Sequence, residues 1–108
     1  MTSTYHLNPR TTKARRGIVF GLYSMDDAIR CNNSFNMRDK LSDAYRAIAP
    51  VSHLVDGEAA QKVSYAKSVL SNCVRNITCN GQISKVDRLN LDFAMSDLVH
   101  ASNLLKLQ

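Results

Sequence analysis

Six small or apolar residues between positions 59 and 77 recur at alternating intervals of four and three residues. Because an α-helix turns once in about 3.6 residues, this spacing puts all six along one side of a helix that packs lengthwise on others. Asn80-Gly81 then supplies a stop signal. The pattern predicts a long helix within a bundle. The six residues are Ala59, Val63, Ala66, Leu70, Cys73 and Ile77.

A second helix is predicted between Phe35 and Pro50, where apolar residues again recur at intervals of three or four. Proline ends this run because it cannot donate the next helical hydrogen bond. The residues that carry this pattern are Met37, Leu41, Ala44, Tyr45 and Ile48.

The last helix is predicted to begin at a capping box, Ser84 to Asp87, with Asp in the position usual for Glu, and to reach almost to Gln108. Its apolar residues cover about half of the helix circumference, more than the stripe of an ordinary surface helix. Such a helix needs more than one neighbour. Residues 86–105 could therefore form the centre of a monomer or the seam of a homodimer, and the sequence leaves both open.

Residues 17–23 are rich in β-branched and aromatic side chains, which is typical of a β-strand. Strand alternation would put Ile18, Phe20 and Leu22 on one face. Ser24 with Asp26-Asp27 suits the start of a short helix that ends near Cys31.

Residues 1–16 are rich in Thr, Ser, Arg and Lys without a sustained apolar period, so we expect an extended basic arm. A length of 108 residues suits one domain. The predicted fold is mainly α: a small bundle of three main helices plus one short helix, with an N-terminal basic arm (residues 1–16) and one short β-strand (residues 17–23). The single helical domain then spans residues 17–108.

Charge is unevenly placed along the chain. The net charge is +5, and residues 1–23 hold four Lys or Arg with no Asp or Glu, whereas the rest of the chain holds ten basic and nine acidic residues. A basic arm on a nearly neutral body commonly meets nucleic acid, an anionic surface or an acidic protein patch, although it can also be a solubilising tail.

No catalytic or metal-binding motif is found in the sequence. The three histidines are far apart, and Cys73 and Cys79 do not have the spacing of a zinc-ligand pair. Paired carboxylates occur as Asp26-Asp27 and as Asp92 with Asp97, but neither spacing puts both side chains on one helix face. Nucleophile motifs and phosphate-binding glycine loops are missing. We therefore expect no enzyme activity, no metal and no cofactor. The odd number of cysteines, with no signal-type or membrane-spanning segment, favours a cytoplasmic protein that does not enter membranes.

Two nucleic-acid motifs match only in part. Residues 16–23 fit some positions of the RNP1 pattern, but the predicted helices that follow do not fit the four-stranded sheet of that module. A helix-turn-helix could run from the helix that carries residues 59–77, through a turn at residues 78–82, to the last helix, with Lys85 and Arg88 facing DNA. However, Asp87 and Asp92 interrupt its basic surface. Nucleic acid therefore remains an alternative mainly through the basic arm.

We interpret the chain as a non-enzymatic binding or regulatory protein that engages a macromolecule, with a protein target favoured over nucleic acid. Basic residues would speed encounter, and apolar residues would hold the complex. The alternatives are sequence-nonspecific DNA or RNA binding and a structural homo-oligomer. The candidate partner-binding residues are Arg10, Lys13, Arg15, Arg16, Ile18, Phe20, Leu22 and Tyr23.

Overall fold

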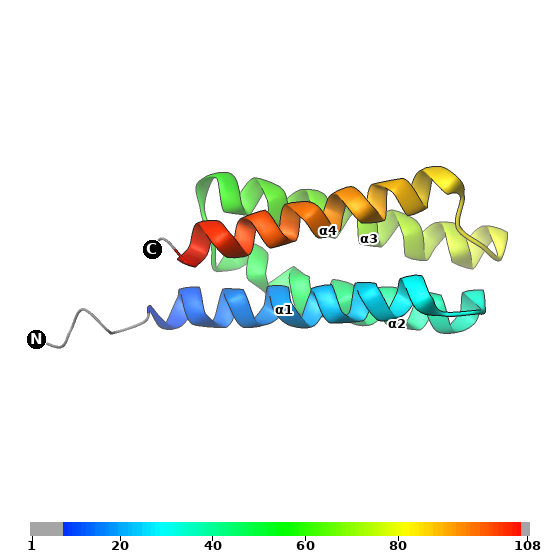
Figure 1. Ribbon diagram of the computed structural model, residues 1–108, viewed down its shortest axis with the longest axis horizontal. Coiled ribbons are helices and arrows are strands. Elements are labelled where there is room, and N and C mark those ends of the chain that lie inside the picture. Colours follow the sequence, from blue (N-terminus) through cyan, green and yellow to red (C-terminus); the bar gives the residue numbers. More distant parts are fainter. Residues whose placement is uncertain (1–7, 107–108) are drawn as a thin grey trace, which may run out of the picture.

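Four long helices follow one another in residues 8–106, the part of the chain that the computed structural model describes. They are α1 (Pro9–Arg30), α2 (Ser34–Ile48), α3 (Gly57–Asn80) and α4 (Lys85–Lys106), and the short 3-10 helix η2 (Ala49–His53) follows α2 directly. Successive helices run in opposite directions, so α1 and α2 form one hairpin and α3 and α4 form a second that lies against it (Figure 1). The fold is an antiparallel four-helix bundle, and the start of α1 and the end of α4 lie at the same end of it.

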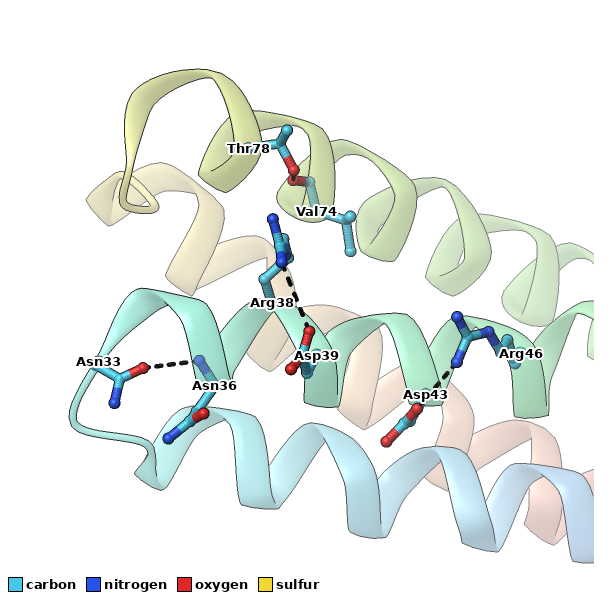
Figure 2. A network of polar contacts seen from close by, with 8 residues as sticks. All are labelled: Asn33, Asn36, Arg38, Asp39, Asp43, Arg46, Val74 and Thr78. Atoms are coloured by element: carbon cyan, nitrogen blue, oxygen red, sulfur yellow. Dashed lines mark hydrogen bonds and ion pairs between the residues drawn. The ribbon is translucent and has the colours of Figure 1, made fainter.

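Local signals set where the helices begin and end. Asn8 caps α1 by accepting a hydrogen bond from the Arg10 amide at 2.8 Å, and Asn33 caps α2 in the same way from the Asn36 amide (Figure 2). Gly81 ends α3 in the left-handed conformation, with φ of 80°. These caps satisfy backbone groups that a helix end otherwise leaves without partners.

The predicted capping box of α4 is confirmed. The Ser84 hydroxyl accepts a hydrogen bond from the Asp87 amide at 3.1 Å, and Asp87 Oδ2 accepts one from the Ser84 amide at 3.5 Å. Asn76 of α3 adds a second donor to the same carboxylate oxygen at 2.9 Å. The cap of α4 is therefore also a polar link to α3.

The apolar periods of the second and third helices are confirmed as core positions. All six residues predicted along α3 are buried, and so are Met37, Leu41, Ala44 and Ile48 of α2, while Tyr45 is partly buried. Closely packed helices bury such a stripe against their neighbours, and this burial is the main stabilising contribution to a small bundle.

The β-strand predicted over residues 17–23 is wrong. These residues lie in the middle of α1, and residues 8–106 contain no strand. The buried positions Ala14, Ile18, Gly21, Met25 and Ala28 are spaced by four, three, four and three, which is a helical period that continues on both sides of the apolar run. Strand propensity is overridden here because the whole 22-residue stripe packs on the bundle.

The predicted short helix after Ser24 is the last part of α1 and not a separate element. Residues 9–16, which we expected to be extended, form the first two turns of the same helix, and residues 1–7 lie outside the described residues. The bundle thus has four main helices, not three main helices and a short one.

The last helix packs on both α3 and α1, as the wide apolar face predicted, but not all of that face is covered. Leu91, Ala94, Leu98, Ala101 and Leu105 are buried. Four large apolar side chains of α4 remain exposed, namely Val86, Leu89, Phe93 and Val99. Over residues 8–106, every helix is too short or too polar to cross a membrane.

Candidate functional site

Helix α1 turns one side to the core and leaves the opposite side open to solvent. Val19, Phe20 and Tyr23 lie three, four and seven residues after Arg16, so all four share one helix face. Lys13 lies one turn before Arg16 on the same face. Phe20 is 59% exposed and Tyr23 is 68% exposed. We call these five residues the outer α1 face. It joins two basic side chains to three apolar or aromatic ones.

The basic residues at the start of α1 have no acidic counterparts. Among residues 8–106, none of Arg10, Lys13, Arg15 and Arg16 lies within 4.0 Å of a carboxylate. Helix α2 is different, because Arg38 lies 3.8 Å from Asp39. Arg46 and Asp43 form a second pair on the same helix at 3.3 Å, and both pairs are drawn in Figure 2. Two of the three cations of α2 thus have a carboxylate within 4.0 Å, whereas none of those at the start of α1 has one.

Of these four cations, only Arg10 lies in the first turn of α1, where the helix dipole acts. The N-terminal end of a helix carries a partial positive charge, so nearby acidic side chains stabilise it and basic ones oppose it. The first turn of α1 has no acidic residue, whereas α3 begins with Glu58 and α4 with Asp87. The first turn of α1 therefore lacks the acidic residue that would complement the helix end.

The structure separates the eight residues predicted from the sequence. Lys13, Arg16, Phe20 and Tyr23 are brought together on the outer α1 face, and the other four are not part of it. Ile18 is fully buried and Leu22 packs partly against the core, so both are structural residues.

Arg10 and Arg15 differ from Lys13 and Arg16 in their surroundings. Arg10 Nη2 donates a hydrogen bond to the carbonyl oxygen of His53 at 2.9 Å, which ties the start of α1 to η2. Arg15 is partly buried, and its Nε has no hydrogen-bond partner within the described chain. Lys13 and Arg16 are therefore the two exposed basic residues of the start of α1 for which the described chain shows neither a side-chain hydrogen bond nor an ion pair, whereas Arg10 is exposed but bonded to His53.

Two glycines hold α1 close to its neighbour. A Cβ at Gly17 would lie 2.5 Å from Val51 Cγ2 and 3.0 Å from the carbonyl oxygen of Ala47. A Cβ at Gly21 would lie 2.5 Å from Ile48 Cδ1. Because only glycine fits this close approach, α1 is fixed against α2 by one side, and its outer face is presented on a rigid element.

Val19 is the residue of this face that sequence reasoning missed. It is 42% exposed, and strand alternation had placed it opposite Phe20. A helical reading of Ala14 to Ala28 would have put both residues on the solvent side, so the signal was present in the spacing.

The described residues offer little for covalent chemistry. Burial, and then the charge of Asp87, raise the pKa of Cys73 to about 12, so its thiol is protonated at neutral pH and is not a nucleophile. In residues 8–106 no three His, Cys, Asp or Glu side chains come together in a way that could hold a metal ion. A shallow groove between α2 and α3 is lined by hydroxyl, amide and basic groups, and its residues are Tyr45, Ser64, Lys67, Ser68, Ser71, Asn72 and Arg75.

Comparisons with protein-family models, with curated proteins and with solved structures give no match for this chain. The outer α1 face is therefore interpreted from its own chemistry.

Proposed function

We propose that this chain is a non-enzymatic binding protein whose outer α1 face docks onto an acidic surface of a protein partner. One observation carries the proposal: Lys13 and Arg16 have no carboxylate partners in the described chain and lie directly before the exposed Val19, Phe20 and Tyr23. The protein would act by occupying its target, as an inhibitor, adaptor or assembly factor, and not by turnover.

The two halves of the face would contribute differently. Uncompensated charge attracts an oppositely charged partner over a distance of about 8 Å at physiological salt and so raises the rate of encounter. Exposed aromatic side chains on a helix can fill pockets in the partner, and such anchors commonly contribute most of the binding energy. Phe20 and Tyr23 are therefore expected to control the dissociation rate, and Lys13 and Arg16 the association rate.

Nucleic acid is a second candidate, favoured by the charge alone. Phosphates would also be attracted to Lys13 and Arg16. A contact to phosphates, however, would not involve the exposed apolar residues beside them. A protein surface uses both halves of the face, and for this reason we favour it.

An affinity-capture experiment with matched variants tests the protein partner. The full chain is used as bait in cell extract, and the captured protein is then purified and its affinity measured directly. We expect Phe20→Ala and Tyr23→Ala each to weaken binding at least about tenfold, which corresponds to about 1.4 kcal/mol. Phe35→Ala is the control, because Phe35 is 63% exposed but belongs to α2. Equal binding by all three variants would contradict the proposal.

Salt dependence separates the two kinds of partner. If nucleic acid binds through Lys13 and Arg16, the logarithm of its affinity should fall with the logarithm of salt concentration with a slope of about −1.8. Replacement of both residues by Glu should then abolish binding, whereas Phe20→Ala should change it little. Binding of a DNA or RNA duplex with this signature would favour nucleic acid over the protein partner.

A further inference from the structure

Helix α4 carries a second exposed apolar stripe, away from α1. Val86, Leu89 and Phe93 are 64%, 54% and 54% exposed, and their spacing of three and four residues aligns them along two turns of the helix. Asp97, one turn after Phe93, lies 3.5 Å from Lys62 of α3, so this side of α4 turns toward α3 and not toward α1. The stripe is distinct from the outer α1 face.

The stripe is symmetric about its middle residue. Leu89 lies three residues after Val86 and four before Phe93, so two apolar side chains flank it at almost equal distances. Lys85 and Asp92 are also seven residues apart, which is nearly two full turns, and they lie together along one edge of the stripe. Their charges are opposite, and within residues 8–106 neither forms an ion pair.

We propose that this stripe binds the same stripe of a second copy of the chain, with the two α4 helices antiparallel and a two-fold axis close to Leu89. In this arrangement Leu89 packs on its own counterpart, and Val86 packs on Phe93 of the other copy. Along the edge, Lys85 faces Asp92 of the other copy twice, once on each side of the axis. A surface of this kind is self-complementary, as a two-fold interface requires.

Charge selects the antiparallel arrangement. In an antiparallel pair, the same edge of each helix meets, but the two edges run in opposite directions. Lys85 at the start of one stripe therefore meets Asp92 near the end of the other. Like charges at close range are destabilising, and opposite charges fix register and direction more than they add affinity. The apolar residues are therefore expected to supply the affinity, and Lys85 and Asp92 the register.

The dimer is expected to be elongated and weak. The axis lies only one turn from the start of α4, so the two bundles overlap only near residues 85–93 and extend in opposite directions. A standard interface buries about 800 Å² on each partner, more than three side chains can supply. Association is therefore expected at micromolar concentrations or above.

Sedimentation of the full-length chain over concentrations from about 10 μM to about 1 mM tests the proposal. We expect a reversible monomer–dimer equilibrium with a frictional ratio above that of a compact dimer. Leu89→Glu puts two carboxylates at the axis and should weaken association at least about tenfold. Val99→Glu is the control, since Val99 is 49% exposed on α4 outside the stripe and should leave association unchanged. A chain that stays monomeric throughout, or a dimer that Leu89→Glu leaves intact, overturns the proposal.

A mixing experiment tests the antiparallel register. Lys85→Asp should weaken self-association because two carboxylates then face two others, and Asp92→Lys should do the same with ammonium groups. In a mixture of the two variants every such pair is again opposite in charge, so heterodimers should form with affinity within about threefold of the original chain. A mixture no better than the separate variants would overturn the arrangement. Neither substitution touches the outer α1 face, so this result is independent of the proposed partner binding.

Discussion

The first hairpin, α1–α2, and the second, α3–α4, are held together by different means. Gly17 and Gly21 let α1 approach α2 so closely that a methyl group would not fit without a shift. The second hairpin is linked by polar groups: Asp87 joins α4 to α3 near their connection, and Asp97 pairs with Lys62 toward the other end.

The helix starts differ in the same way. Helices α3 and α4 each have an acidic residue in the first turn, which suits the positive helix end, whereas the first turn of α1 has none and contains Arg10. The second hairpin thus follows the rules of helix stability in its local sequence, and the first departs from them on its solvent side. The outer α1 face, where we propose that a partner binds, lies on this helix.

The largest effect on stability is expected at Ile18, which the strand and helix interpretations place differently relative to Phe20. Ile18 and Phe20 would share a face in a strand, but in α1 the first is fully buried and the second is exposed. Ile18→Ala should reduce the free energy of unfolding by about 2–5 kcal/mol because it leaves a cavity, and Phe20→Ala by less than about 0.5 kcal/mol. Urea unfolding of both variants measures this. Similar losses for the two would contradict the helical placement.

Much of the fold could be predicted from the sequence where local and global signals agree. The stripe from Ala59 to Ile77, the stop at Gly81 and the cap at Ser84 all favour one structure, and the bundle has it. The composition of residues 17–23 alone favours a strand, whereas the spacing of the buried residues from Ala14 to Ala28 favours a helix. A prediction from the seven residues alone is therefore wrong. The exposure of Val19 and Phe20 follows from the period of the buried residues only when the segment is interpreted as a helix, so the strand interpretation concealed it.

The next largest effect on stability is expected at Asp87, which links α4 to α3 in the second hairpin. Asp87→Ala removes the acceptor for the Ser84 amide and for Asn76 Nδ2. The loss of a cap and of a partly buried hydrogen bond should cost about 2 kcal/mol in urea unfolding. Asp92→Ala is the control on the same helix and should cost less than about 0.5 kcal/mol, because Asp92 is exposed. Equal costs would mean that Asp87 does not link the helices.

The same region predicts a dependence of stability on high pH. The pKa of Cys73 rises from 9.0 to about 12 because the thiol is buried and because Asp87 is near. Above pH 9 the unfolded chain loses this proton while the folded chain keeps it. Stability is therefore complete below pH 9 and falls as the pH approaches 12, with a loss of about 2 kcal/mol by about pH 10.5. Relative to the original chain, Cys73→Ala should show a flatter profile between pH 9 and 10.5, whereas Cys79→Ala should not.

The close approach of α1 to α2 predicts smaller effects on stability when Gly17 or Gly21 is replaced by alanine, and the two effects should differ. Alanine gains about 1 kcal/mol in helix propensity over glycine, but overpacking commonly costs about 1–3 kcal/mol. At Gly17 the methyl would meet the Ala47 carbonyl and the stiff Val51 side chain, so Gly17→Ala should be destabilising by about 1 kcal/mol. At Gly21 it would meet Ile48 Cδ1 and Cγ1 at 2.5 and 2.7 Å, while the nearest backbone atom is 3.8 Å away, so only the buried Ile48 side chain must shift and Gly21→Ala should cost less, about 0.5 kcal/mol. Thermal unfolding of both variants tests this order.

The smallest effect on stability is expected from Thr12→Glu, a substitution that should change stability and partner binding in opposite directions. Thr12→Glu puts a carboxylate near the positive end of α1 and four residues before Arg16, and both interactions should stabilise the helix, together by about 0.5 kcal/mol. The same charge would neutralise part of the basic cluster and should weaken binding of an acidic partner. Thr12→Gln has a similar shape without the charge and should change neither property by as much. If Thr12→Glu raised the unfolding temperature and left binding intact, the basic residues of α1 would lose their role in recognition, and only the aromatic part of the outer α1 face would remain as the docking surface.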